Sequence, residues 1–400
     1  MEGPPWRPLH GWTRPIRAVH SRRVAGRSQE ALYAGLDLEL SWSERELPQV
    51  ARTKHVHGLH PYLGKFVPQL VEVFLDRYFA AGDTVYDPFV GSGTTLVEAN
   101  ARRMRAVGCD ISAFNCLLAR VKTTRYALAS LELSLRVAAE EARRSEEDLL
   151  GQATPWLRTW YAPQALQELL RYRAAIRELD DPAWDVARVI LSRAARSARR
   201  TTHFDLDFPS EPVTGPYLCH KHKRTCRPVD EAAKFLRRYT HDTVRRLRQF
   251  GAVRTQAKVE VLHDDARVVE LPWRVAGIVT SPPYPGLIDY HEQHRYAYEL
   301  LGLRDRRGAE IGAAAAGTRR SAVTGYVEAM THAFANARRR LPTGAPVVIV
   351  VNDSRDLYPA ILDGAGVRLD RRLTRHVNRR TGRRAGEFYE QVLVCHVARR

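Results

Sequence analysis

Two short segments, far apart in the chain, carry residues whose types and spacing could do chemistry together. The first is Asp87-Pro88-Phe89-Val90-Gly91-Ser92-Gly93-Thr94-Thr95, and the second is Thr280-Ser281-Pro282-Pro283-Tyr284; each follows a short apolar run. Closely spaced glycines after a strand let backbone N–H groups turn toward a ligand and approach it closely. Ser281 offers a side-chain oxygen, and Pro282, which has no N–H, offers a rigidly held carbonyl. Such a pair of acceptors can activate an amine by binding both of its hydrogens.

The glycine loop differs from two common phosphate-binding loops. No Gly-Lys-Ser/Thr follows it, which excludes the loop of P-loop NTPases, and Leu96 stands where a dinucleotide fingerprint has its third glycine. Taken alone, the two glycines are also compatible with a tight strand-to-helix turn that binds nothing.

Together and in this order, the two segments resemble the motifs of class I amino-methyltransferases of DNA, the family that methylates N4 of cytosine or N6 of adenine. The match is nearly residue for residue over 87–99, and the likeness extends over about 55–125 and 258–300. The resemblance implies an α/β, Rossmann-like fold with a seven-stranded, mostly parallel sheet, here interrupted by a large helical insertion. It also implies S-adenosylmethionine as the cofactor, no required metal, and double-stranded DNA as the substrate, with the target base flipped out of the helix.

The resemblance also implies which residues hold the cofactor. We expect the methionine end at the glycine loop, the ribose at Asp110 and the adenine at Asp265, which matches the family pattern slightly better than Asp264. The implied cofactor residues are His60, Tyr62, Lys65, Phe66, Asp87, Pro88, Phe89, Gly91, Ser92, Gly93, Thr94, Asp110 and Asp265. Two alternatives stay open: Asp110 could cap a helix, and residues 60–66 could be a basic aromatic loop without a special role.

The catalytic residues implied in the same way are Ser281, Pro282, Pro283 and Tyr284, the last stacking on the flipped base. Within the family, a serine at the first of these positions favours N4 of cytosine, whereas Asp or Asn favours N6 of adenine. The next segment is polar and aromatic, and we expect it to contact the flipped nucleotide or its phosphates through Asp289, Tyr290, His291 and Arg295. The alternative is that these four lie on the exposed face of an amphipathic helix.

Elements of regular structure must position these residues. Apolar periodicity predicts a helix over 70–79 and another over 94–102. Short apolar runs predict strands over 84–86, 106–110, 258–262, 276–279, 346–351 and 388–397. A strand, a glycine loop, a helix and a second strand ending in an acid are typical of doubly wound α/β folds.

Between the two halves of this pattern the chain is mostly helical. Helices are predicted over 131–150, 163–179, 184–199 and 230–250. We therefore divide the chain into an N-terminal extension (1–50), a catalytic domain (51–111 and 256–400) and a helical insertion (112–255), a candidate target-recognition region. Arg193, Arg196, Arg199 and Arg200 are spaced to share a helix face that could bind DNA phosphates. A lid or an oligomer interface is the alternative role of the insertion.

Cysteine and histidine gather within that insertion. Cys219, His220, His222 and Cys226 fall within eight residues, and all four are of types that bind zinc. The spacing matches no standard zinc finger, and we interpret the segment as a basic loop that touches phosphate rather than as a metal site.

Composition supports an anionic partner. The chain carries 63 Lys and Arg against 45 Asp and Glu, a net charge of +18, although only 7 of the basic residues are lysine, which a GC-rich genome could also explain. Five cysteines indicate no disulfide framework, and neither a secretory signal nor a membrane-spanning run is recognisable, so we expect a cytoplasmic protein. The resemblance further implies a restriction-modification context with a partner nuclease. The rivals are an RNA base methyltransferase and an inactive nucleic-acid-binding scaffold.

Overall fold

The computed structural model describes residues 40–64, 66–203, 209–317, 319–377 and 388–399. At its centre lies a seven-stranded sheet in the order β5-β2-β1-β6-β7-β9-β8. The first five strands run parallel to one another, and β9 runs antiparallel to both β7 and β8. The strands are β1 (Thr84–Asp87), β2 (Arg105–Asp110), β5 (Val259–His263), β6 (Gly277–Thr280), β7 (Pro346–Val351), β8 (Val367–Val377) and β9 (Phe388–Val397). The predicted Rossmann-like class is confirmed.

Helices cover both faces of this sheet, as the alternation of side chains along β7 shows. Val347, Ile349 and Val351 pack against α13 (Arg320–Arg338) and α14 (Tyr358–Ala365). Val348 and Val350 point the other way and pack against α3 (Pro68–Tyr78) and α4 (Thr94–Ala101). Because successive residues of a strand face opposite sides, one apolar strand supplies both cores.

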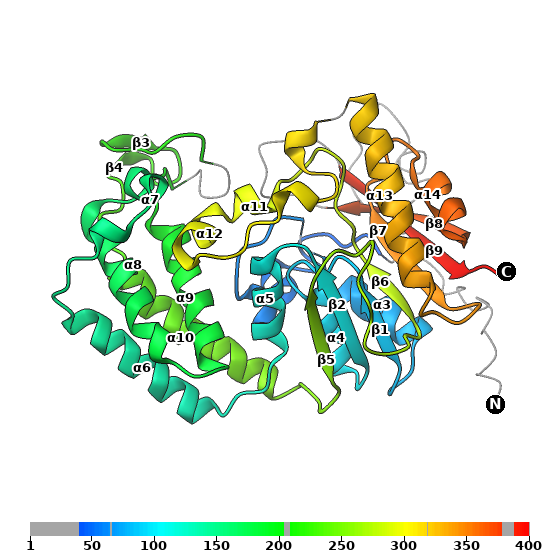
Figure 1. Cartoon of the computed structure of the whole chain (residues 1–400), viewed down its shortest axis with the longest axis horizontal. Coiled ribbons are helices and arrows are strands. Elements are labelled where there is room, and N and C mark those ends of the chain that lie inside the picture. The colour runs from blue at the N-terminus through cyan, green and yellow to red at the C-terminus, as the bar shows by residue number, and fades with distance from the viewer. Residues whose placement is uncertain (1–39, 65, 204–208, 318, 378–387, 400) are drawn as a thin grey trace.

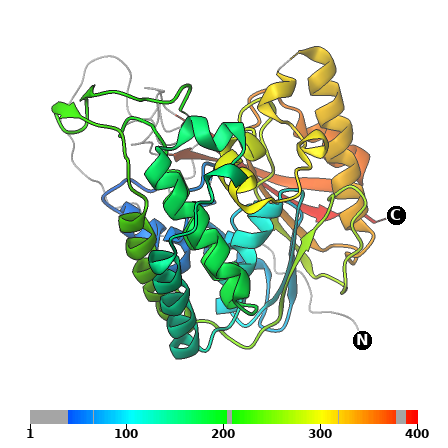
Figure 2. The same ribbon diagram turned by 60° about the vertical axis from the view of Figure 1, so that its left-hand side comes forward.

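A separate block of helices follows β2 and stands beside the sheet in both views (Figure 1, Figure 2). The helix α5 (Ala113–Thr123) still packs on β2 and β5 of the sheet and joins it to this block. The helices of the block are α6 (Leu128–Arg144), α7 (Pro155–Trp160), α8 (Pro163–Ala175), α9 (Ala183–Ala198) and α10 (Ala233–Gly251). Two short strands, β3 (Tyr217–Cys219) and β4 (Arg224–Cys226), form a hairpin at its edge. After β6 the chain forms α11 (Tyr290–Gln293) and α12 (Arg295–Leu301), which lie between the block and the sheet. The short helix α2 (Gln49–Arg52) precedes α3.

The structure corrects three details of the sequence prediction. The helix predicted over 131–150 is α6, which ends at Arg144 before an exposed polar run. Strand β8 was not predicted. Two of the four arginines expected on a DNA-facing surface are buried: Arg193 donates to Thr243 Oγ1 (2.7 Å) and Asp242 Oδ2 (2.5 Å), and Arg199 lies over the ring of Tyr296. Those two arginines hold the helices together and do not face a partner.

Two further predictions concern the N-terminal extension and membrane-spanning helices. Residues 1–39 of the expected N-terminal extension fall outside the described residues. Within the part that the structure describes, we find no helix long and apolar enough to cross a membrane.

Strand β6, which leads into Ser281, is packed too closely for a side chain at its first residue. A Cβ atom on Gly277 would lie 2.5 Å from the Pro346 carbonyl oxygen of β7 and 2.7 Å from the Phe79 ring. We expect Gly277→Ala to lower the free energy of unfolding by about 1–3 kcal/mol, since the backbone of β7 has to move. Gly151→Ala is the control because nothing lies within 4 Å of its added Cβ. Urea unfolding followed by circular dichroism measures both, and equal stabilities of the two variants would contradict the packing described.

Candidate active site

The loop between β1 and α4 turns in a way that only glycine allows without strain. Gly91 has φ +47° and Gly93 has φ +81°, and Gly93 is the N-cap of α4. A Cβ on Gly93 would lie 3.0 Å from Ala119 Cα, and one on Gly91 would lie 3.0 Å from the Tyr62 hydroxyl. The sequence places glycine here because both the backbone conformation and the neighbours exclude a side chain.

Asp87 joins this loop to the strand that carries Ser281. Its Oδ1 atom accepts hydrogen bonds from the backbone N–H of Phe89 (3.1 Å) and from Thr280 Oγ1 (2.6 Å). In a second link between the same elements, Thr95 Oγ1 donates to the Val279 carbonyl (3.2 Å). Burial raises the pKa of Asp87 to about 6, although these donors oppose the shift.

Asp110, at the end of β2, is held by three donors. Its Oδ2 accepts from the Gly91 N–H (2.8 Å), and its Oδ1 accepts from the Ser112 N–H (2.9 Å) and Asn115 Nδ2 (3.2 Å). Burial raises the pKa of this carboxyl to about 6 as well. The N-cap of α5 is Ser112, whose hydroxyl accepts from the Asn115 N–H, so Asp110 is not the helix cap that we considered as its alternative role.

The Ser-Pro-Pro-Tyr segment leaves β6 at the same edge of the sheet. The Pro283 carbonyl accepts from the Tyr326 hydroxyl (2.9 Å), and the Tyr284 hydroxyl donates to Glu390 Oε1 (3.3 Å). Burial, reinforced by the negative charge of Glu390, raises the pKa of Tyr284 well above its ordinary value. The Tyr284 hydroxyl is therefore protonated. Among the described residues we find no donor to the Pro282 carbonyl, which leaves that oxygen available as an acceptor.

The residues upstream of β1 form an aromatic wall. Tyr62 stacks on Tyr290 (centroids 5.5 Å apart) and on His294 (5.6 Å). His60 is buried behind this wall: its Nδ1 donates to the Pro61 carbonyl (2.6 Å), and its Nε2 faces the Tyr296 hydroxyl (3.4 Å). Burial lowers the pKa of His60 well below its usual range, so His60 is neutral and positions its neighbours.

Most of the predicted cofactor and catalytic residues meet in one pocket. Those that line it are Tyr62, Phe66, Asp87, Pro88, Phe89, Gly91, Ser92, Thr94, Asp110, Asp265, Ser281, Pro283 and Tyr290. Those that do not are His60, Gly93, Pro282, Tyr284, Asp289, His291 and Arg295. Lys65 lies outside the described residues.

Asp265 lines the pocket, whereas Asp264 does not. Arg267 binds both carboxylate oxygens of Asp265, at 2.5 Å from Nη2 and 2.9 Å from Nε. Burial alone would raise the pKa of Asp265, but the Arg267 guanidinium and backbone N–H hold it below its ordinary value.

Three of the residues expected to touch the substrate have other partners in this structure. Asp289 caps α11 through the Glu292 N–H (3.0 Å). His291 is fully buried, with its Nδ1 2.9 Å from Glu310 Oε2. Arg295 binds Glu299 (3.2 Å) and lies over the Trp156 ring on the helical side of the molecule.

The sequence did not reveal three polar residues of the pocket wall, Ser112, Asn115 and Glu310. Glu310 accepts from the Tyr290 N–H (2.8 Å) in addition to facing His291, so it fixes the start of α11. Its surroundings in the sequence, a run of Gly and Ala, carry no signal. Asn115 could have been found, because it stands in the first turn of the helix that follows the strand-end acid, and its amide faces that acid.

Comparison with known proteins identifies relatives over nearly the whole chain. The sequence model of the N6/N4 methyltransferase family, described as DNA methylase, matches residues 18–120. The type II methyltransferase M.MjaII of Methanocaldococcus jannaschii is 35% identical over 450 aligned residues, which take in 91% of this chain and 84% of that protein. The type II methyltransferase M.MvaI of Kocuria varians is 33% identical over 90 residues, or 20% of each protein. Among solved structures, TrmN from Thermus thermophilus gives a TM-score of 0.33 at 16% identity, over 84% of this chain and 50% of that one.

Gly91 offers a direct test of the pocket. We expect Gly91→Ala to weaken binding of S-adenosylmethionine at least about tenfold, because the added methyl group meets the Tyr62 hydroxyl and strains a left-handed backbone. Gly82→Ala is a matched control: Gly82 also has a positive φ (+95°), but nothing lies within 4 Å of its Cβ. Isothermal titration calorimetry measures the affinity of each variant. If both bind as the unmodified protein does, the glycine loop is not part of the binding site.

Proposed function

The chain belongs to the N6/N4 DNA methylase family, and we propose that within it this protein methylates the exocyclic N4 amine of cytosine in duplex DNA. Family membership makes it an S-adenosylmethionine-dependent DNA methyltransferase. The choice of base, the roles of individual residues and the biological setting are the proposal.

The charge of the pocket supports binding of S-adenosylmethionine, whose sulfonium and ammonium groups are cationic. The chain as a whole carries a net charge of +18, yet the pocket wall includes the carboxylates Asp87, Asp110, Asp265 and Glu310. Among its described lining residues we find no Lys or Arg. At Gly91 the loop leaves no room for a side chain beside Tyr62, so the backbone itself forms this part of the pocket wall. We assign the methionine end to this loop, the ribose hydroxyls to Asp110 and the adenine to Asp265.

The observation that carries the proposal is the position of Ser281 on the wall of this same pocket, directly after Thr280, whose hydroxyl is bonded to Asp87. A base amine placed at Ser281 would therefore lie next to the cofactor. When bound, S-adenosylmethionine supplies an electrophilic methyl group. Proximity of this kind accounts for a large part of the rate of a transfer reaction.

Ser281 and Pro282 have the chemistry to activate the amine. The lone pair of a base amine is delocalised into the ring, and two acceptors that bind both hydrogens return it to the nitrogen. We assign these roles to Ser281 Oγ and the Pro282 carbonyl, since the Pro283 carbonyl is already bonded to Tyr326. The amine proton becomes acidic as the new C–N bond forms, so no strong general base is required. Tyr284, anchored by Glu390, is assigned to the face of the flipped base.

The serine at position 281 supports cytosine as the target, because members of the family with serine at this position favour N4 of cytosine. Both curated relatives are named type II methyltransferases. On that ground we propose a restriction-modification context with a cognate nuclease, and we assign contact with the target sequence to the helices between β2 and β5.

Nucleoside analysis tests the proposal. The protein is expressed in a methylation-deficient bacterium beside Ser281→Ala, and modified nucleosides from digested DNA and RNA are quantified by mass spectrometry. We expect N4-methylcytosine in DNA, and a rate for Ser281→Ala lower by about 10²–10³, the usual loss when one group that stabilises the transition state is removed. N6-methyladenine would overturn the choice of base, and a mark confined to RNA would overturn the substrate. No mark from folded protein that binds the cofactor would favour the inactive scaffold.

The raised pKa of Asp110 predicts how cofactor binding depends on pH. The pKa of this carboxyl is about 6 in the folded protein and about 4 in an unfolded chain, so ionisation of Asp110 lowers the stability of the ligand-free protein as pH rises from about 4 to 6. A cationic ligand that also donates hydroxyl groups favours the ionised form. We therefore expect the dissociation constant to rise about tenfold from pH 7.5 to pH 5.

The variant Asp110→Asn separates the contribution of Asp110 to the pH dependence of binding from the contributions of other groups. The variant should bind weakly at pH 7.5 and show a smaller dependence on pH, with the remainder due to Asp87, whose pKa also lies near 6. Calorimetry at several pH values measures both proteins. A variant that keeps the full pH dependence would show that Asp110 does not bind the ligand.

A further inference from the structure

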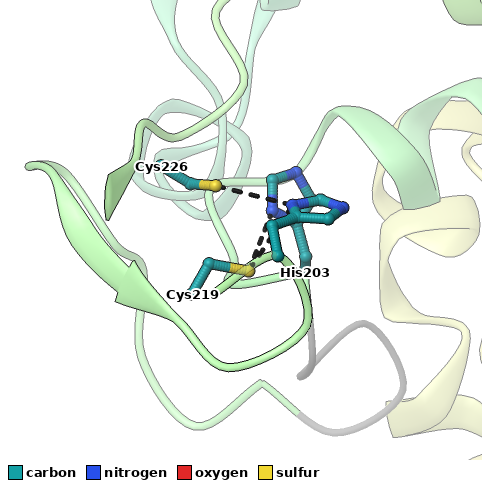
Figure 3. Close-up of side chains that lie close together, drawn as sticks. His203, Cys219 and Cys226 are labelled. Atoms are coloured by element: carbon teal, nitrogen blue, oxygen red, sulfur yellow. Dashed lines mark hydrogen bonds between the residues drawn. The ribbon is translucent and has the colours of Figure 1, made fainter. Parts of the chain in front are cut away.

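The hairpin of β3 and β4 brings together four side chains that bind transition metals. They are His203, from the loop after α9, and Cys219, His222 and Cys226, from the hairpin itself. Figure 3 shows the sulfur atoms of Cys219 and Cys226 turned toward His203. All four potential ligand atoms lie within 4.8 Å of one another.

The distances match those of a tetrahedral zinc site. Cys219 Sγ lies 3.6 Å from His203 Nδ1 and 3.6 Å from His222 Nδ1, and Cys226 Sγ lies 3.5 Å from His222 Nδ1. With Zn–S of about 2.3 Å and Zn–N of about 2.0–2.1 Å at tetrahedral angles, sulfur and nitrogen ligands are about 3.6 Å apart. Hydrogen bonding alone explains the cluster less well, because the single lone pair of His222 Nδ1 faces two thiol groups.

The set differs from the one that the sequence suggested. His220 is exposed and is not part of the cluster, and His203 takes its place. The hairpin ligands follow the spacing Cys-x2-His-x3-Cys, which lies within the range of zinc sites, and the fourth ligand comes from 16 residues upstream of Cys219. Because this partner is distant in sequence, a search for paired short spacings misses it.

The hairpin has little else to hold it together. Each strand is three residues long, and Leu218, directly before Cys219, is 69% exposed. A two-stranded hairpin is marginally stable in water, and small units without an apolar core commonly depend on a metal for folding free energy. Tyr217 holds His203 beside the hairpin: its hydroxyl accepts from the His203 backbone N–H (3.1 Å) and lies 2.9 Å from Nδ1. A metal ion bound at His203 Nδ1 would replace the hydroxyl group of Tyr217 at that atom. The hydrogen bond from the His203 backbone N–H to the Tyr217 hydroxyl would remain.

We propose that His203, Cys219, His222 and Cys226 bind one structural Zn²⁺ ion. Two sulfur and two imidazole ligands select zinc over the hard cations Mg²⁺ and Ca²⁺, and four protein ligands leave no position for a substrate. The ion holds the hairpin in place and fixes the turn that carries Lys221 and Lys223, together with Arg224 at the start of β4. The site takes no part in methyl transfer.

A second cluster shows what distinguishes this site. His55, His57 and Glu98 also lie close enough to share a metal. There, however, the Glu98 carboxylate already binds Lys54 (3.1 Å) and Arg102 (2.9 Å), whose positive charges oppose a metal ion. That cluster is an ion-pair network. Among the described residues, the sulfur atoms of the hairpin contact neither a carboxylate nor an arginine, and they face imidazole nitrogens.

Metal analysis of the full-length protein, purified without a metal-affinity step, tests the site. We expect about one zinc per chain by plasma mass spectrometry, and loss of most of it in Cys226→Ser and His203→Ala after dialysis against a chelator. His220→Ala and Cys395→Ser are the controls, since His220 is an exposed neighbour outside the cluster and Cys395 is a buried free thiol in the sheet. Both controls should keep their zinc.

Cobalt substitution keeps the test independent of how well the variants fold. Co²⁺ added to metal-free, unmodified protein should give the intense visible bands of a tetrahedral site and a thiolate charge-transfer band. A chain that carries no zinc and gives no such spectrum would overturn the proposal. So would Cys226→Ser that retains stoichiometric zinc, or a different metal bound by these four residues.

Discussion

The site depends on one buried hydrogen bond between residues 193 positions apart, from the Thr280 hydroxyl to the Asp87 carboxylate. It joins the glycine loop to the residue directly before Ser281, and the bond from Thr95 to the Val279 carbonyl repeats the link one residue earlier on β6. A hydrogen bond to a charged group contributes about 1.5–3 kcal/mol, and leaving a buried carboxylate without its donor costs more. The two parts of the pocket therefore cannot separate without exposing an unpaired charge.

The same edge of the sheet concentrates negative charge within a basic protein. Parallel strands end side by side, so the acids that terminate β1 and β2 are brought together by topology. Burial raises the pKa of Asp87 and Asp110; each accepts from backbone N–H groups of the following loops, and Asp87 also accepts from the Thr280 hydroxyl of β6. The fold thus keeps two carboxylates in a place that favours their neutral form. Such an arrangement is suited to a cationic ligand, because the positive charge of the ligand would stabilise the ionised form of both carboxylates.

The sequence, read through its resemblance to a known family, located residues that the fold brings together where they follow a strand directly. The motif resemblance and the order of short strands and polar loops predicted a common site for Asp87, Gly91, Asp110 and Ser281, and all four line one pocket. The sequence was insufficient where burial depends on a distant partner. Nothing near Arg193 shows that Asp242 and Thr243 will bury it. Strand β8 was missed because it is a polar edge strand whose alternation is broken by a bulge between Leu369 and Arg371.

The helical block and the pocket share one continuous apolar core, which has a mechanical consequence. This core runs from Phe114 and Leu117 of α5 through Leu169 and Val189 to Leu247 of α10. Arg199, just after α9, lies 4.8 Å over the Tyr296 ring, which faces His60, and the neighbouring His294 stacks on Tyr62 of the pocket wall. Because protein interiors are close-packed, a shift of α9 has to displace this series of rings. The helices that follow β2 therefore brace the aromatic wall of the pocket.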